Sequence, residues 1–156
     1  MSFSVKVKKM SPMIGTDIQL PYYATPGSAG LDLSACIEEE ITIHPGERVK
    51  IPTGIAVQMP HSQVVGLVFP RSGNAWKYGV SMTNAVGVID SDYTGEIQVI
   101  LQNLDSTAPF VVKKGDRIAQ LLFVPVFQAN LEVVDDLDES ERGSAGFGST
   151  GTIQSK

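Results

Sequence analysis

The chain has 156 residues, which favours one domain, and a domain of this size buries roughly 68–70% of its unfolded surface. Its net charge of −5 repels nucleic acid, and no apolar run approaches the ~20 residues of a membrane helix, so we expect neither nucleic acid nor a membrane as partner. The single cysteine excludes an intrachain disulfide and a cysteine-based zinc cluster, and the basic start lacks the apolar core of a secretory signal. We therefore expect a cytoplasmic protein.

Short β-branched runs alternate with turn residues along most of the chain, and this pattern predicts an all-β sandwich or barrel. A helical turn or two is predicted only at residues 72–78. Turn sequences at 44–47 and 113–116 lie between apolar pairs, and each predicts a hairpin. The predicted strands are residues 4–8, 41–43, 48–51, 54–58, 64–69, 97–101, 110–112, 118–126 and 131–134.

An acidic run follows the last predicted strand, from Asp135 to Glu141. Such a run is typical of a solvated and flexible segment. We therefore expect a single β domain over residues 1–134, with residues 135–156 forming a flexible C-terminal arm.

The stretch from residue 83 to residue 96 crowds polar side chains between two apolar segments. Val88 and Ile89 predict a short buried strand that ends at Asp90. Asp90 and Asp92 would share one face in extended chain, unless a turn between them redirects one carboxylate. The glycine at 95 permits a tight or positive-φ turn into the next strand. A hairpin with a merely acidic loop explains the same residues.

Polar residues also occur amid turns elsewhere. Asp32 stands between two leucines, where it either serves a site or only caps a turn. Arg71 and Ser72 open the possible helical turn, and N–H groups at a helix start suit a phosphate. The alternative is an N-cap serine beside a surface arginine. Gln120 lies in an apolar strand and should have a hydrogen-bond partner there.

The glycine-rich segment 142–151 combines one arginine and one phenylalanine with several N–H donors. By composition alone it is a disordered end. Alternatively, Arg142 offers a fork for phosphate oxygens and Phe147 a flat face for a base. An acidic chain can bind an anionic ligand only where a site supplies such local donors.

The five segments, in this order, resemble the five motifs of the trimeric dUTPase family, and the resemblance covers roughly residues 10–151. It implies a jelly-roll-like β fold and a homotrimer whose active sites are shared between subunits. It also implies hydrolysis of dUTP to dUMP and pyrophosphate, which lowers uracil entry into DNA and supplies the precursor of thymidylate. The matching segments are residues 29–33, 70–73, 87–95, 115–121 and 142–151.

The resemblance implies roles residue by residue. Asp90 aligns with the general base that activates a water for attack on the α-phosphorus, and Tyr93 with the ring that excludes a 2′-hydroxyl. Mg²⁺ is implied as a bridge across the phosphates, and we expect Asp32 to act structurally or through a water on that metal. The implied substrate contacts are Asn84, Gly87 and Ile97 for uracil, Arg71, Ser72, Gly73 and Gln120 for phosphate, and Arg142, Phe147, Gly148 and Ser149 in the tail.

Two other functions stay open. A dCTP deaminase shares the implied fold but would lack the Asp-x-Asp-Tyr arrangement found at residues 90–93. A silent nucleotide-sensing or interaction protein on the same trimer would lack the base or the tail, and both are present. The chain departs from the pattern at Trp76-Lys77-Tyr78, where many members carry a Lys-His pair.

Overall fold

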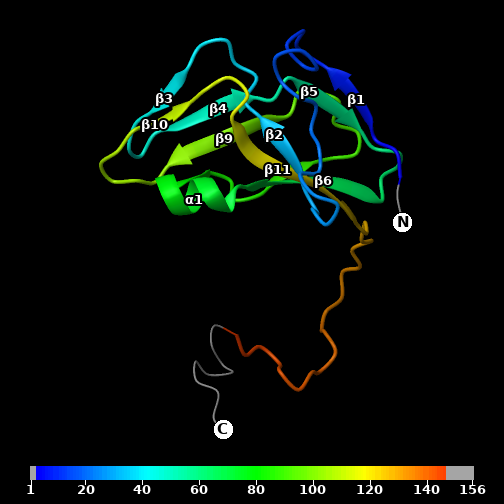
Figure 1. Cartoon of the computed structure of the whole chain (residues 1–156). Coiled ribbons are helices and arrows are strands. Elements are labelled where there is room, and N and C mark those ends of the chain that lie inside the picture. Colours follow the sequence, from blue (N-terminus) through cyan, green and yellow to red (C-terminus); the bar gives the residue numbers. More distant parts are fainter. Residues whose placement is uncertain (1–2, 147–156) are drawn as a thin grey trace.

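The computed structural model describes residues 3–146. Figure 1 shows the strands gathered into one body, from which the chain after the last strand leads away. In chain order the elements are β1 (Lys6–Lys9), β2 (Leu31–Ser34), β3 (Ile41–Ile43), β4 (Arg48–Pro52), β5 (Ile55–Gln58), β6 (Val64–Pro70), α1 (Ser72–Tyr78), β7 (Val80–Met82), β8 (Gly87–Ile89), β9 (Gln98–Asn103), β10 (Phe110–Val112) and β11 (Arg117–Pro125). The predicted all-β, jelly-roll-like domain is confirmed.

Antiparallel ladders connect all the strands, and most neighbours in a sheet are distant in the sequence. The largest sheet has the order β2-β11-β6-β8, and a second has the order β4-β9-β7. The pairs β1-β5 and β10-β3 complete the fold. β11 therefore lies between β2 and β6 and pairs with both, so the ends of β2 and β6 lie on the same side of the sheet.

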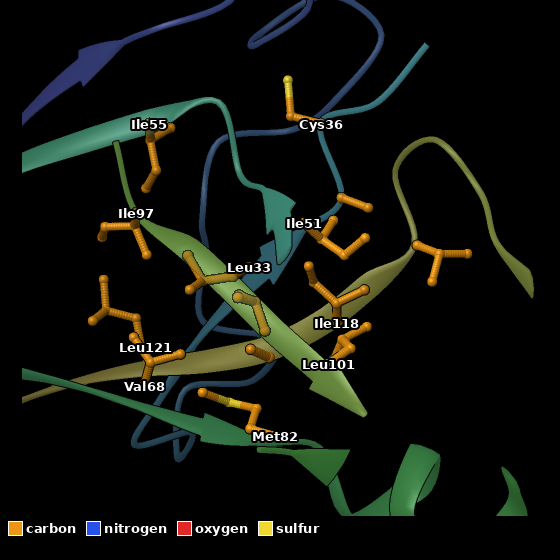
Figure 2. Packing of buried hydrophobic residues seen from close by; sticks show 14 of the residues in the cluster. Leu33, Cys36, Ile51, Ile55, Val68, Met82, Ile97, Leu101, Ile118 and Leu121 are labelled. Carbon is orange, nitrogen blue, oxygen red and sulfur yellow. The ribbon is translucent and has the colours of Figure 1, made fainter. Parts of the chain in front are cut away.

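The hydrophobic core follows from the two-residue period of the strands. In β9, Val99 and Leu101 are buried while Ile100 between them is only partly buried, and β6 buries Val64, Gly66 and Val68 in the same alternation. Alternate side chains of a strand point to opposite faces, so each of these two strands contributes one face to the core. Figure 2 shows Val68 and Leu101 in one cluster with Leu33 of β2, Ile51 of β4 and Leu121 of β11.

Most predicted elements are present, and the helix has the predicted bounds of 72–78. Two short strands, β2 and β7, were not predicted. The predicted strand at 131–134 is wrong, because that segment pairs with nothing in the described part of the chain. Leu131 and Val133 are 93% and 97% exposed. A strand needs a second strand to take its backbone hydrogen bonds, and here the segment has none.

The two predicted hairpins are wrong, although their turns are present. His44 N donates to Glu47 Oε2, and Lys113 N donates to Asp116 Oδ2, both at 2.8 Å. The strands on either side of each turn do not pair with each other, because β3 pairs with β10, β4 with β9, and β11 with β2 and β6. Each turn therefore carries the chain from one sheet to another. No helix within residues 3–146 is long and apolar enough to cross a membrane.

Candidate functional site

Asp90 follows β8 at the edge of the largest sheet. Tyr93 N donates to Asp90 O at 3.1 Å and closes a turn over the two residues between them. Asp90 and Asp92 therefore do not share a strand face, because the turn that the sequence allowed for is present. Val88 is 61% exposed, so β8 is not the buried strand that was predicted. As an edge strand it presents Asp90 to solvent.

A cleft of about 320 Å³ lies beside Asp90, between β8 and the start of β9. We call it the Asp90 cleft. β8 pairs only with β6, and β9 pairs with β7 only from Leu101 onward, so in the described residues both walls have unpaired strand backbone. Such edges offer N–H and C=O groups to a flat polar ligand. The cleft is lined by Lys50, Val88, Ile89, Asp90, Tyr93, Glu96, Ile97, Gln98 and Ile100.

Ile97 lines this cleft, but its backbone is already used inside the chain. Its N–H donates to Ile55 O at 2.9 Å, and its C=O accepts from Thr53 N at 3.2 Å and Thr53 Oγ1 at 2.6 Å. Backbone groups of successive strand residues point to opposite sides, so those of Gln98 point toward the cleft. Sequence reasoning missed Gln98. No pattern in the sequence marks Gln98, because the side to which its backbone groups point depends on how β9 pairs with β4.

Asn84 and Gly87 lie on the same wall as β8. Asn84 is exposed in the loop between β7 and β8, and Gly87 is the first residue of β8. A Cβ on Gly87 would lie 3.3 Å from Val68 Cβ and 3.6 Å from Asn84 Nδ2. The amide of Asn84 therefore packs close to the beginning of the strand that forms the cleft wall.

A second cluster forms around Asp32, whose side chain is 2% exposed. Arg71 Nε donates to Asp32 Oδ1 at 3.2 Å, and Arg117 Nη1 donates to Oδ2 at 3.0 Å. Gln120 Nε2 donates to Oδ1 at 3.4 Å, which is the partner that its place in an apolar strand required. A buried carboxylate must be paired. Asp32 is thus a buried anion that holds three donor side chains in one place.

The cleft next to this cluster is lined by several cationic side chains. It has a volume of about 510 Å³, and we call it the Arg71 cleft. Three cationic side chains and one carboxylate give it local positive charge within an acidic protein. Such charge can hold an anion that the field of the whole chain would repel. Its lining is Arg71, Asn74, Tyr78, Pro109, Phe110, Val111, Lys113, Asp116, Arg117 and Ile118.

The start of α1 adjoins Arg71. Arg71 itself is the N-cap and makes no side-chain cap bond, so Ser72 is not the N-cap serine of the alternative interpretation. Ser72 and Gly73 are both exposed. Their hydroxyl and N–H groups are therefore open to a ligand beside the Arg71 guanidinium.

The two clefts lie at opposite ends of β6. Ile89 pairs with Gly66, so Asp90 lies opposite Val65, whereas Arg71 comes after the other end of the strand. Six residues separate these two positions along β6, and at about 3.3 Å per residue that is roughly 20 Å. One chain does not bring Asp90 and Arg71 together.

The tail reaches neither cleft in the described residues. Arg142 is exposed, and its Nε donates to Ala145 O at 3.1 Å within the segment that leads away from the domain (Figure 1). The other predicted tail contacts, Phe147, Gly148 and Ser149, lie outside the described residues.

A dedicated metal site is not formed by the described residues, where no three His, Cys, Asp or Glu side chains come close enough to hold an ion. A carboxylate has about four acceptor positions, and Asp32 uses three of them on Arg71, Arg117 and Gln120. One position is left for a water. This donor set fits a Mg²⁺ that takes its ligands from substrate oxygens and water.

Comparison with known proteins gives one family. The family model described as dUTPase matches residues 16–151. A deoxyuridine 5'-triphosphate nucleotidohydrolase of Desulfitobacterium hafniense is 55% identical, over 95% of this chain and 97% of that protein. One of Hahella chejuensis is 48% identical, over 97% of this chain and 99% of that protein.

Solved structures agree with the fold. A mutant dUTPase of Staphylococcus bacteriophage 80alpha, solved with dUpNHpp, superposes with a TM-score of 0.82 at 26% identity and covers 97% of this chain and 100% of its own. A mutant dUTPase of phage phi11 of S. aureus, described with a structural Mg(II) ion, has a TM-score of 0.74 at 22% identity, over 88% of this chain and 100% of its own.

Proposed function

Because the chain belongs to the dUTPase family, we propose that it hydrolyses dUTP to dUMP and pyrophosphate. The observation that carries the proposal is the Asp90 cleft, in which a solvent-facing carboxylate and a tyrosine ring adjoin two unpaired strand edges. The reaction would lower uracil entry into DNA and supply dUMP for thymidylate synthesis. We propose that it takes place in the cytoplasm.

The strand edges are suited to recognising uracil. Uracil has an N–H donor at N3 where cytosine has an acceptor, so fixed backbone groups that pair with uracil leave a buried group unpaired with cytosine. In our proposal Gly87 and Gln98 supply the backbone and Asn84 supports it. Tyr93 then lies against the deoxyribose and leaves no room for a 2′-hydroxyl.

The chemical step needs one base and no covalent intermediate. Asp90, as a carboxylate, accepts a proton from a water while the water oxygen attacks the α-phosphorus. The bond between that phosphorus and the oxygen bridging to the β-phosphorus breaks, and pyrophosphate leaves with the electron pair. In the proposed complex Arg71, Ser72, Gly73 and Gln120 hold the phosphates. Arg142, Phe147, Gly148 and Ser149 close over the nucleotide.

Mg²⁺ is the proposed cofactor. When bound, it reduces the negative charge of the triphosphate. Its ligands would be phosphate oxygens and waters, and Asp32 would reach it through one water at most, because the other acceptor positions of this carboxylate are taken. Asp32 acts chiefly by holding Arg71 and Gln120 in place.

The separation of the clefts supports a homotrimer with shared sites. A general base acts within about 3 Å of its proton or through one water, and an arginine contacts a phosphate oxygen at about 2.8 Å. The backbone positions of Asp90 and Arg71 are roughly 20 Å apart, and the Arg71 guanidinium is held on Asp32 in β2, at the opposite edge of the sheet from β8, so one chain does not direct both groups to one triphosphate. An Asp90 cleft from one subunit and an Arg71 cleft from another can meet these limits. Phe127, Leu131 and Val133, in the segment that connects β11 to the arm, are exposed apolar side chains that packing against a neighbouring subunit would bury.

Pyrophosphate release tests the proposal. With Mg²⁺ present, dUTP should release pyrophosphate, whereas dCTP, dTTP and UTP should react far more slowly. Release of ammonia from dCTP would instead identify a deaminase. Tight binding of dUTP without turnover would identify the silent nucleotide-sensing alternative.

A further inference from the structure

Tyr93 makes a hydrogen bond with its backbone and another with its hydroxyl. Its backbone N–H donates to Asp90 O at 3.1 Å, and its hydroxyl donates to Glu96 O at 2.9 Å. The residue is 43% exposed, so packing alone does not fix the direction of the side chain. The hydrogen bond to Glu96 O is therefore what fixes the far end of the ring.

Gly95 lies directly beneath this ring. A Cβ at residue 95 would lie 2.6 Å from the Tyr93 hydroxyl oxygen, 2.7 Å from Cζ and 3.0 Å from Cε2. Gly95 does not have positive φ, so the turn requires glycine for space and not for backbone conformation. A carbon contact needs about 3.5 Å, so any larger residue must displace the ring by roughly 1 Å.

Glu96 joins this turn to the core. Gly54 N donates to Glu96 Oε1 at 2.8 Å, next to the hydrogen bonds between Ile97 and residues 53–55. Gly54 has a φ of 72°, and a Cβ there would lie 2.6 Å from the buried Cys36 Sγ. The Glu96 side chain is thus bonded to a backbone position that is closely packed against Cys36 and Ile14.

We propose that Gly95 and Glu96 are positioning residues, which hold the Tyr93 ring at the place where it excludes a 2′-hydroxyl. The inference rests on the proposed function. Gly95 provides the space for the ring, and the anchored Glu96 side chain fixes the carbonyl that accepts the Tyr93 hydroxyl. Selectivity for deoxyribose is therefore set by three residues and not by the tyrosine alone.

The test is the ratio of kcat/KM for dUTP to kcat/KM for UTP in the full-length enzyme. A displacement of about 1 Å in a positioned group can cost up to 10²-fold, so Gly95→Ala should lower the ratio about 10-fold or more. Glu96→Ala should lower it about threefold to tenfold by freeing the turn. Glu96→Gln keeps an oxygen acceptor for Gly54 N–H and should stay within about twofold of wild type.

Gly27→Ala is the matched control for the added methyl group. A Cβ on Gly27 meets nothing within 4 Å and its φ is not positive, so selectivity and the unfolding midpoint should both stay unchanged. The thermal unfolding midpoint of each variant shows whether the substitution has lowered stability. General damage to the enzyme lowers kcat/KM for dUTP and for UTP together and leaves their ratio unchanged, whereas lost positioning of the ring changes the ratio. If Gly95→Ala fails to fold, the Glu96 variants still decide the question.

A double-mutant cycle is the most specific test of this inference. Tyr93→Phe removes the hydroxyl that Glu96 O accepts, so adding Glu96→Ala to it should change the ratio little further. If the effects of Tyr93→Phe and Glu96→Ala on the ratio were additive, the proposal would be overturned. An equal ratio for Glu96→Gln and Glu96→Ala would also overturn it, because the charge of Glu96 and not its hydrogen bond to Gly54 would then matter. If Tyr93→Ala narrows the ratio while Gly95→Ala and Glu96→Ala do not, this inference fails and the proposed function stands. A wild type that releases no pyrophosphate from dUTP would overturn both.

Discussion

Mixed trimers offer a direct test of the shared site. Asp90→Asn removes the proposed base, and Arg71→Ala removes the proposed phosphate contact after the other end of β6, roughly 20 Å away in the same chain. Each variant alone should be nearly inactive. Arg71→Ala leaves Asp32 paired with Arg117, so the subunit should still fold.

The expected recovery follows from counting. If the two variants are unfolded and refolded together in equal amounts, each site draws its Asp90 and its Arg71 independently from different chains. Both groups are then intact in about a quarter of the sites, and activity should recover to roughly 25% of wild type. If both groups came from one chain, no site would be complete and no activity would return.

A matched control uses one chain that carries both substitutions, refolded in equal amounts with wild type. Shared sites again predict about a quarter of wild-type activity, whereas sites built from a single chain predict about a half. Size-exclusion chromatography with light scattering should give three chains per particle in each mixture. Recovery of zero in the first mixture together with a half in the second would refute the reasoning from the length of β6.

Four further predictions can be measured on single variants. Asp90→Asn should lower kcat about 10²–10⁴-fold while a non-hydrolysable dUTP analogue still binds, and near-normal turnover would exclude Asp90 as the base. Tyr93→Ala should narrow the preference for dUTP over UTP, chiefly by raising kcat/KM for UTP. Truncation after Ser140 should leave the unfolding midpoint unchanged and abolish most turnover, whereas a midpoint lower by many degrees would place the arm in the core. Asp32→Asn weakens two ion pairs whose arginines are partly exposed, so the free energy of unfolding should fall by about 2 kcal/mol and Tm by roughly 4–8 °C. The KM for dUTP should rise, because Arg71 and Gln120 are no longer held in place.

The sequence predicted most strands because they are short runs of apolar and β-branched residues between turn residues. In β6 and β9 every second residue is buried, but the apolar residues form a continuous run, so the β-branched run and not an alternation of residue types predicted these strands. Pairing between strands carries no comparable signal. The turns at His44–Glu47 and Lys113–Asp116 have the residues of hairpin turns, yet each connects different sheets. Turn chemistry determines the local reversal of the chain and not which strand the next segment joins.

The proposed site residues were chosen from the sequence by their chemistry, and their arrangement in space came only from the structure. Asp90 and Tyr93 fall in one cleft, and Arg71, Asp32 and Gln120 in one cluster, as the order of the motifs implies. The distance between the two groups depends on the register of β8 on β6, which no local pattern encodes.

The same holds for the choice between neighbouring residues in a strand. A motif assigns uracil recognition to the region of Ile97, but adjacent strand residues turn their backbone groups to opposite sides. Ile97 gives its N–H and C=O to residues 53–55, so the next residue, Gln98, faces the cleft. The hydrogen bonds that occupy the backbone of Ile97 lie next to the bond from Gly54 N to Glu96, and together they hold the turn below Tyr93. One set of contacts with residues 53–55 thus fixes both the wall that would read the base and the ring that would read the sugar.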